Sequence, residues 1–349
     1  MRGGALVGGV RRAVLFAIVA LPWRVASAQR MEALWYATGS EQSTQAFLAH
    51  ADRISTVSPQ VFFFDSLGNI TGAIDPRLVA AARAHHVQVV PLVMNRGFNQ
   101  ALMHRILVTP DARDRAVQSL AALCRDSRFD GIQFDIENVH VSDRDALTDF
   151  MRRSAAALHA VRCTVSAAVV PRASDDRGPT SYHQWMYDNW RGVYDYKALA
   201  DALDFLSYMT YAQHTGGSTV GPVAGYTWME DCLRFVLSQG VPPDKISLGI
   251  PAYSDYWYPA YDSTNGARMR GRDVSYARVT ELVSRFGLTP AWDDREKAAA
   301  VAWSNAGVYE HLWIEDARAF AAKLELVRKY KLRGYSVWVL GLEDPAVWR

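Results

Sequence analysis

Residues 130–137 read Asp130-Gly131-Ile132-Gln133-Phe134-Asp135-Ile136-Glu137. Polar and apolar side chains alternate along this stretch, which is typical of a β-strand, because successive side chains of a strand point to opposite faces. Gln133, Asp135 and Glu137 therefore share one face, and the three apolar side chains share the other. Two carboxyl groups and an amide are costly to bury without polar partners. We expect this polar face to enter a barrel near its mouth and to serve catalysis; the alternative is a buried network that only closes the barrel.

On both sides of this stretch, short β-rich apolar runs alternate with amphipathic segments of helical period. The predicted strands cover residues 33–37, 61–65, 87–94, 131–137, 164–170, 205–211, 246–251 and 334–340. The predicted helices cover residues 44–51, 76–85, 111–124, 143–161, 196–202, 228–238 and 315–331. Eight strands that alternate with helices predict an α/β fold, the (β/α)8 TIM barrel. An open doubly wound sheet shows the same alternation, but no glycine-rich phosphate loop follows the first strand.

The spacing between the predicted strands is even until the last pair. About sixty residues, roughly 253–312, lie between the seventh predicted strand and the last predicted helix. They have a mixed α/β, aromatic-rich character of their own. A structureless loop of this length is uncommon in a compact domain. We therefore predict a small α+β insertion between strands seven and eight, on the barrel face that usually carries active sites.

The first 28 residues have the three parts of a secretory signal peptide. Arg2, Arg11 and Arg12 precede the apolar run 13–22, and small residues at 26–28 provide a cleavage site. The apolar run is too short to span a bilayer. We predict a signal peptide over 1–28, a catalytic barrel over 29–349, and a secreted or periplasmic location with no membrane span after cleavage. An uncleaved membrane anchor is the alternative.

Charge and cysteine content exclude several classes of partner. The formal net charge is +2, and the four arginines of the first 28 residues, which contain no acid, bring the remainder to −2. No basic patch remains to bind nucleic acid, and we expect a monomer. The spacing of Cys124, Cys163 and Cys232 fits no zinc site, so no metal or cofactor is expected. In an oxidising compartment one cysteine pair can form a disulfide, and Cys124 with Cys163 is the first to examine; three buried thiols are the alternative.

The two carboxyl groups on the polar face suit acid catalysis. Asp135 and Glu137 lie close enough for their charges to interact, so we expect the pair to hold one proton near neutral pH. Glu137 lies nearest the predicted mouth and is better placed to donate this proton to a leaving oxygen. Asp135 lies one step deeper, where it can stabilise charge.

At these residues the sequence resembles glycoside hydrolase family 18, whose fourth strand carries the pattern Asp-x-x-Asp-x-Asp-x-Glu. Three further segments resemble the sixth, seventh and eighth strands of that family: SYMTY at 207–211, LGIPAY at 248–253 and GYSVW at 334–338. Within the family, residues 194–199, 209–214 and 340–345 are similar to the bacterial cell-wall branch that includes spore-cortex-lytic glucosaminidases. This similarity implies a bacterial source.

The resemblance implies a retaining glycoside hydrolase that cleaves β-1,4-linked N-acetylglucosamine-containing glycan of the peptidoglycan type. In this family the substrate's own acetamido group attacks the anomeric carbon. By analogy Glu137 is the acid and base, and Asp135 stabilises the oxazolinium intermediate. The substrate-binding residues that the resemblance implies are Gln133, Met209, Tyr211, Gln213, Tyr253 and Trp338. Tyr211 would bind the acetamido carbonyl, and Trp338 would form the floor under the sugar.

Two positions depart from the family pattern. Gln133 replaces the usual aspartate, and Ala212 follows Tyr211 where many chitinases have aspartate, which leaves Gln213 to substitute for that contact. Three alternative functions remain open: a non-hydrolytic, lectin-like glycan-binding relative, a chitinase, and an endoglucosaminidase acting on protein-linked glycans. Because the glutamate whose loss is the clearest route to a lectin-like relative is present as Glu137, the sequence favours an enzyme.

Aromatic residues crowd two of the predicted loop regions, after the fifth and the seventh strand. They are Tyr182, Trp185, Tyr187, Trp190 and Tyr194, and Tyr253, Tyr256, Trp257, Tyr258 and Tyr261. Flat rings stack on the apolar faces of sugars, so as a group these residues suggest an extended cleft. The alternative is that they pack the long loops.

Overall fold

Eight parallel strands close into a barrel because the first of them, β1, pairs with both the last strand, β15, and the second, β2. The barrel strands are β1 (Glu32–Ala37), β2 (Thr56–Phe64), β5 (Leu92–Asn95), β6 (Gly131–Asp135), β7 (Thr164–Val169), β8 (Phe205–Tyr208), β9 (Ile246–Pro251) and β15 (Gly334–Trp338). This computed structural model describes residues 1, 3–4, 31–264 and 266–349, so the predicted signal peptide lies almost entirely outside the described residues. The predicted TIM barrel is confirmed.

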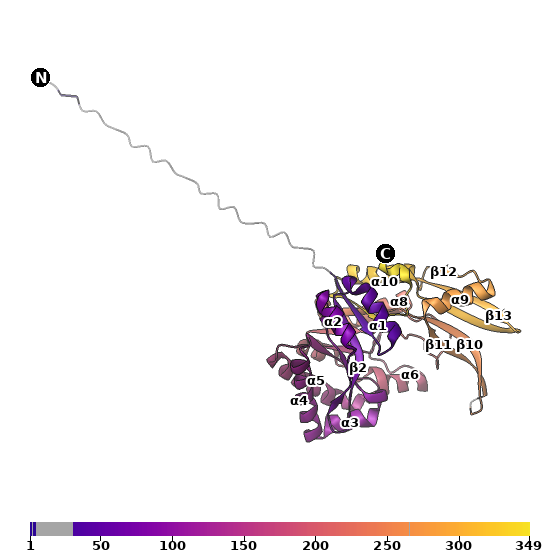
Figure 1. Cartoon of the computed structure of the whole chain (residues 1–349), viewed down its shortest axis with the longest axis horizontal. Helices are drawn as coiled ribbons and strands as arrows, with labels where there is room; N and C mark the ends of the chain where they lie inside the picture. Colours follow the sequence, from indigo (N-terminus) through magenta and orange to yellow (C-terminus); the bar gives the residue numbers. More distant parts are fainter. Residues whose placement is uncertain (2, 5–30, 265) are drawn as a thin grey trace. The chain divides into compact units, whose positions relative to one another are not determined.

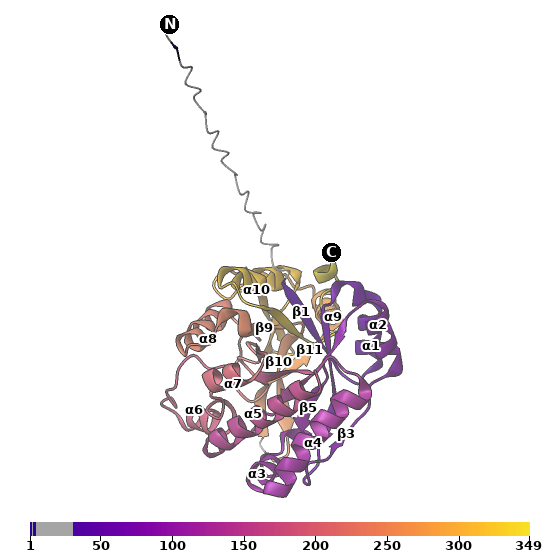
Figure 2. The ribbon, with the colours of Figure 1, turned by 90° about the vertical axis from the view of Figure 1, so that its left-hand side faces the viewer.

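Helices surround the barrel strands, as Figure 2 shows. They are α1 (Glu41–His50), α2 (Pro76–Ala84), α3 (Gln100–Val108), α4 (Pro110–Ser127), α5 (Arg144–Ala160), α7 (Tyr196–Ala202), α8 (Tyr226–Ser238) and α10 (Ala317–Lys329), with the short α6 (Ser181–Met186) in the loop after β7. Ile132, Phe134 and Ile136 are fully buried in the main core under these helices. The predicted apolar face of residues 130–137 is therefore confirmed. None of the helices in the described residues is both long and apolar enough to cross a membrane.

Several strand boundaries differ from those predicted. The second strand begins at Thr56 instead of Val61, because its pairing with β1 runs through Pro59 and its pairing with β5 contains a bulge near Gln60. The run 87–94 is divided into β4 (Gln88–Val89) and β5, since Pro91 has no N–H to continue the ladder. Helix α3 was not predicted; it ends at Val108 because Pro110, the first residue of α4, cannot continue a helix from the preceding turn.

The polar ends of three strands also differ, and this matters for the site. The predicted strands 131–137, 205–211 and 334–340 end earlier, at Asp135, Tyr208 and Trp338. On β6 the reason is that the last pair with β5 is Met94 with Asp135, so no neighbouring strand extends further. Residues predicted at the tips of strands therefore lie on the loops just beyond them.

Between β9 and α10 the chain forms an antiparallel sheet with the strand order β11-β10-β14-β13-β12. Its elements are β10 (Ser254–Asp262), β11 (Gly266–Val274), α9 (Tyr276–Phe286), β12 (Ala291–Asp293), β13 (Ala298–Asn305) and β14 (Val308–Ile314). Figure 1 shows these orange and yellow elements together on one side of the barrel. A small core of its own, which includes Val279, Leu282, Trp303 and Leu312, packs α9 against the sheet.

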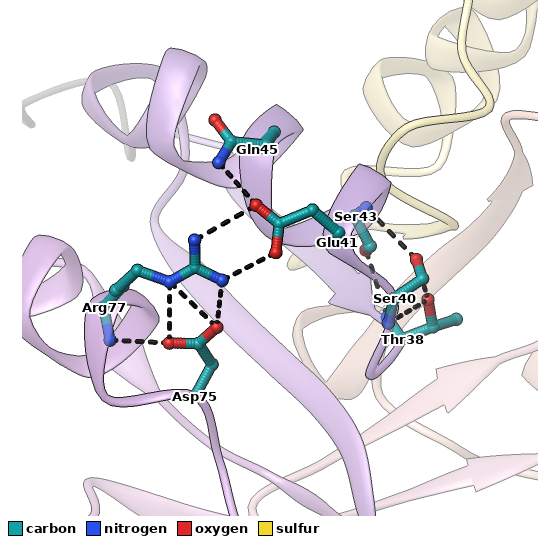
Figure 3. A network of polar contacts seen from close by, with 7 residues as sticks. All are labelled: Thr38, Ser40, Glu41, Ser43, Gln45, Asp75 and Arg77. Atoms are coloured by element: carbon teal, nitrogen blue, oxygen red, sulfur yellow. Dashed lines mark hydrogen bonds and ion pairs between the residues drawn. The ribbon is translucent and has the colours of Figure 1, made fainter.

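Polar contacts join the first two barrel helices at their N-terminal ends, as Figure 3 shows. The guanidinium of Arg77 lies between two carboxylates, that of Asp75, which caps α2, and that of Glu41 in the first turn of α1. The Arg77 Nη2–Glu41 Oε2 distance is 2.7 Å, and these hydrogen bonds lower the pKa of Glu41 to about 2. Arg77 and Glu41 are solvent-exposed and Asp75 is half-buried, so the contact orients the helices more than it stabilises the fold.

At the N-terminal end of the barrel a disulfide joins Cys124 of α4 to Cys163, which directly precedes β7. Their Cα atoms are 6.5 Å apart, and the bond flanks β6 as expected. Cys232 on α8 is a buried free thiol. At the same end the Asp130 carboxylate accepts a hydrogen bond from the Val89 N–H at 2.8 Å. The first aspartate of the motif thus fastens β4 to the barrel, remote from the carboxyl ends of the strands.

Candidate active site

A cavity of about 740 Å³ opens at the carboxyl ends of the barrel strands, and both Asp135 and Glu137 line it. Asp135 is the last residue of β6, and Trp338, which also lines the cavity, is the last residue of β15. Most of the other lining side chains are apolar or aromatic. This location agrees with the rule that TIM-barrel active sites lie at the C-terminal face.

The backbone around Glu137 is held in place although it lies beyond the end of β6. The buried amide of Asn95 makes two hydrogen bonds to the Glu137 peptide: Nδ2 donates to its carbonyl at 2.8 Å, and Oδ1 accepts from its N–H at 3.2 Å. The Tyr194 hydroxyl donates to the Ile136 carbonyl at 2.8 Å. These contacts hold the backbone from which the Glu137 side chain extends, and Asn95, which comes from another strand, was not among the predicted site residues.

The two carboxyl groups interact directly. Burial raises the pKa of Asp135 to about 6, while hydrogen bonds from Gln60 and Glu137 act in the opposite direction. Burial and the neighbouring charge of Asp135 raise the pKa of Glu137 well above its ordinary range. The pair therefore holds one proton near neutral pH, and this proton resides on Glu137. A protonated glutamate beside an ionised aspartate can donate a proton at one atom and stabilise positive charge at the other.

Gln60 on β2 also belongs to the site. Its Nε2 donates to Asp135 Oδ2 at 3.3 Å, and its side chain lines the cavity. Sequence analysis missed it because the second strand was predicted to begin one residue later, at Val61. The only signal for Gln60 is a polar residue next to a strongly apolar run.

Gln133 lies one layer below the cavity and is fully buried. Its Oε1 accepts from the Tyr36 hydroxyl at 2.7 Å, and its Nε2 donates to Ser166 Oγ at 2.9 Å. Tyr36 lies 2.6 Å from Ser207 Oγ, and Ser207 in turn lies 2.7 Å from Ser336 Oγ. The structure does not bring Gln133 to the cavity wall. An amide can both accept and donate here, whereas a carboxylate could not donate to Ser166 and would add a second buried charge beside Asp135.

Four of the six predicted substrate-binding residues line the cavity: Met209, Tyr211, Tyr253 and Trp338. Burial raises the pKa of Tyr211 well above its usual value, so its hydroxyl keeps its proton and can donate a hydrogen bond. Gln213 does not reach the cavity wall; its Oε1 accepts from the Gly225 N–H at 2.7 Å. Ala212 lines the cavity without a polar group to replace the missing carboxylate.

The predicted aromatic loops contribute unequally. Tyr182, Trp185 and Trp190, from α6 and the π-helical turn η4 (Tyr187–Arg191), line the cavity together with Phe98. The Trp185 and Trp190 rings are 6.4 Å apart, and Phe98 lies edge-on to Trp190 at 6.3 Å. By contrast, Tyr194 is fully buried below the site.

Of the aromatic residues after β9, Tyr253 alone reaches the cavity among the described side chains. Trp257 is fully buried, and Tyr256 stacks on Trp303 inside the insertion at a centroid distance of 5.8 Å. For these residues the alternative of packing within the loops is correct. Among the described residues, no group of three or more His, Cys, Asp or Glu side chains is arranged to hold a metal ion.

Comparisons with known proteins agree with this geometry. A model of the family Glycosyl hydrolases family 18 matches residues 47–343. The uncharacterized glycosylase YvbX of Bacillus subtilis is 24% identical over 320 residues, which cover 90% of this chain and 88% of YvbX. The cortical fragment-lytic enzyme of Bacillus subtilis is 26% identical over 269 residues, which cover 75% of this chain but only 58% of that protein. The crystal structure of a chitinase from Chromobacterium violaceum superposes with a TM-score of 0.80 at 28% identity, covering 91% of this chain and 96% of that one.

Proposed function

Because the chain belongs to glycosyl hydrolases family 18, we propose that it is a secreted, retaining hydrolase of β-1,4-linked N-acetylglucosamine-containing glycan of the peptidoglycan type. The observation that carries this proposal is the Asp135–Glu137 pair, which holds one proton at the wall of a large aromatic cavity. A general acid with a raised pKa is what cleavage of a glycosidic bond requires.

In the proposed reaction Glu137 gives its proton to the glycosidic oxygen while the acetamido carbonyl oxygen of the same sugar attacks the anomeric carbon. The leaving sugar departs as an alcohol, and an oxazolinium ion remains. Ionised Asp135 stabilises its positive charge, and the Tyr211 hydroxyl, whose proton is retained, donates to the acetamido oxygen. Glu137, now a carboxylate, takes a proton from water as that water attacks the anomeric carbon. Two successive inversions give overall retention.

The names of two relatives support different glycans. The cortical fragment-lytic enzyme supports a peptidoglycan-type substrate, and its 58% coverage means that only part of that protein corresponds to this chain. The chitinase from Chromobacterium violaceum supports chitin as the second candidate. Sequence similarity to the cell-wall branch at residues 194–199, 209–214 and 340–345 favours the first candidate.

Secretion is supported by the signal pattern at residues 1–28 and by the Cys124–Cys163 disulfide, since disulfides persist in oxidising compartments. A bacterial culture expressing the full chain tests this proposal. Mass spectrometry of the extracytoplasmic fraction should find a mature N-terminus near Gln29. Retention of residues 1–28 in a membrane fraction would contradict cleavage.

The enzymatic proposal is tested by incubating the mature protein with purified peptidoglycan and with N-acetylglucosamine oligomers, beside its Glu137→Gln variant. The wild type should release reducing ends, and proton NMR of the first products should show the β-anomer, as retention requires. Faster release from the oligomers than from peptidoglycan would favour the chitinase candidate. If the wild type releases no more reducing ends than Glu137→Gln on either substrate, the protein is not the hydrolase proposed here.

A further inference from the structure

Arg191 is the only cationic side chain among the described residues that line the cavity. It ends the π-helical turn η4, on the same loop as Trp185 and Trp190. The two acids of the cavity share a proton, so the wall carries one negative group at Asp135 and one positive group at Arg191. A neutral chain of N-acetylglucosamine gives a guanidinium no charged partner.

The Arg191 guanidinium has no protein partner in the described part of the chain. Its Nε is buried without an acceptor, and its side chain makes no ion pair or hydrogen bond there. Two other arginines with an unbonded buried Nε differ in having a partner for the same guanidinium: Arg113 donates to the Leu107 carbonyl, and Arg144 donates to the Tyr194 carbonyl. The terminal Nη groups are not among the buried unbonded atoms, so they remain accessible to an external acceptor.

The neighbouring Trp190 lines the same cavity, but its indole Nε1 is closed to solvent, so this residue offers a ligand its ring and not its N–H. The backbone of the turn that carries both residues is held by two hydrogen bonds. Arg172 Nη1 donates to the Arg191 carbonyl at 3.0 Å, and the Gly192 N–H donates to the Tyr187 carbonyl at 2.7 Å. The backbone position from which the Arg191 side chain extends is therefore set before any ligand arrives.

We propose that Arg191, through its terminal Nη groups, binds a carboxylate carried by the glycan and so selects acidic over neutral substrates; this inference rests on the proposed function. A guanidinium presents parallel N–H groups that match the two oxygens of a carboxylate. In a peptidoglycan-type glycan the carboxylate comes from the 3-O-lactyl group of muramic acid or from a peptide attached to it. N-acetylglucosamine has neither, so Arg191 distinguishes this glycan from chitin.

The test uses four tetrasaccharides with the mature protein. One contains only N-acetylglucosamine, and the second alternates it with muramic acid bearing a free lactyl carboxylate. In the third the lactyl carboxyl is a neutral methylamide, and in the fourth it is joined to alanine, whose own carboxylate lies further out. The quantity compared is kcat/KM for each glycan divided by kcat/KM for the neutral one. Wild type should cleave the free acid with a higher kcat/KM than the methylamide. If the alanine conjugate is also cleaved faster than the methylamide, a carboxylate of the attached peptide can take the place of the lactyl carboxylate.

Arg191→Gln should lower the acid-to-neutral preference by about 10- to 100-fold, since a charged hydrogen bond contributes about 1.5–3 kcal/mol. Arg191→Lys keeps the positive charge but lacks the planar guanidinium, so it should retain part of the acid-to-neutral preference. The wild-type preference should fall as salt rises, and that of Arg191→Gln should not. The matched control is Arg125→Gln, because Arg125 lies exposed on α4 at the opposite end of the barrel and pairs only with Asp126; it should keep the wild-type preference.

Equal rates for the acid and the methylamide in wild type, or an unchanged preference in Arg191→Gln, would overturn the role of Arg191. If wild type cleaves none of the glycans, the proposed function fails, and binding then decides the inference separately. Calorimetry with Glu137→Gln and with the double variant Glu137→Gln/Arg191→Gln compares affinities for the acid and the methylamide. If Glu137→Gln binds the acid more tightly than the methylamide and the double variant does not, the role of Arg191 is supported. If the double variant keeps this preference, the role of Arg191 is refuted.

Discussion

Two groups of carboxyl side chains among the described residues have raised pKa values, and they differ in what surrounds them. Asp135 and Glu137 line the cavity at the end of β6. Asp255, Asp273 and Glu315 lie where the insertion sheet meets α10, and none of them lines that cavity. The comparison separates two consequences of burying an acid, one chemical and one structural.

In the second group Asp255 and Glu315 are buried by surrounding protein, whereas Asp273 is exposed. Asp255 and Asp273 are directly opposite each other on β10 and β11, and burial raises the pKa of Asp255 to about 8. Burial also raises the pKa of Glu315 to about 7, although its ion pair with the fully buried Lys323 acts in the opposite direction. A raised pKa therefore marks burial wherever it occurs. It marks catalysis only where the acid also faces a space that a substrate can enter.

The largest difference between the groups should appear when one acid from each is made neutral. Glu137→Gln should lower kcat by about 10³-fold, as expected for loss of a general acid and base. Glu315→Gln should leave kcat close to the wild-type value, because Glu315 does not line the cavity. Reducing-end assays on both variants check this. A comparable loss of kcat in Glu315→Gln would show that the two groups are not functionally distinct.

Removal of a counter-charge should affect stability in the second group alone. Lys323→Met leaves Glu315 buried without its partner, and we expect a loss of about 3 kcal/mol in the free energy of unfolding at pH 7. The double variant Lys323→Met/Glu315→Leu should recover most of this loss, because it buries no unpaired charge. Urea denaturation gives both values. A single variant as stable as wild type would mean that Lys323 does not compensate the charge of Glu315.

Both groups should make stability fall as the pH rises, because all five pKa values are raised, and Asp255 tests the share of the second group. Asp255 keeps its proton in the folded state up to about pH 8 but loses it near its ordinary value of 3.8 when unfolded. Its contribution to stability is complete below that value and is lost as the pH rises through 8, with a slope of at most about 1.4 kcal/mol per pH unit. Asp273 and Glu315, whose pKa values are also raised, act with the same sign.

Asp255→Asn should therefore flatten the decline in unfolding free energy between pH 5 and pH 8. Urea denaturation at each pH unit measures the slope for wild type and variant, and Asp52→Asn, an exposed change near Arg53, serves as the control. If the unfolding free energy of Asp255→Asn declines as steeply as that of wild type, the proton whose loss lowers stability is not bound to Asp255.

The smallest expected effect is a change in the pH profile of activity. In wild type, kcat/KM should fall below about pH 6 as Asp135 becomes protonated, and again at higher pH as Glu137 loses its proton. Asp135→Asn removes the charge that helps to raise the pKa of Glu137. The acid limb should disappear, and the alkaline limb should move to lower pH in the residual activity. Unmoved limbs would show that the two carboxyl groups titrate independently.

The strand pattern of residues 130–137 and the alternation of strands and helices were sufficient to predict the barrel, and family membership confirms the resemblance drawn from the motifs. These signals are local: a period of two or 3.6 residues is visible in a short window. The cavity-lining positions of Met209, Tyr211, Tyr253 and Trp338 followed from whole motifs at strand ends.

Residues that act singly could not be found in this way. Gln60 and Asn95 reach the site from β2 and β5, and their contacts join residues 75 and 42 positions apart in the chain. A single amide has no periodicity, and its role depends on the register between strands. The same limit explains Gln133: strand parity placed it on the polar face correctly, but only the depth of the barrel decides that it lies beneath the cavity.

The amide of Gln133 also determines the route by which protons reach Glu137. Hydroxyl groups can pass a proton from one to the next, and such a series runs through the barrel from Ser336 to Ser207 and Tyr36. It meets Gln133, whose carboxamide neither takes up nor releases a proton at neutral pH. Gln133 therefore stops proton transfer toward Ser166, and the series opens only to the cavity, whose wall includes Tyr36. Proton exchange with Glu137 is thus confined to the cavity side, so an occupied cleft also controls when the acid regains its proton.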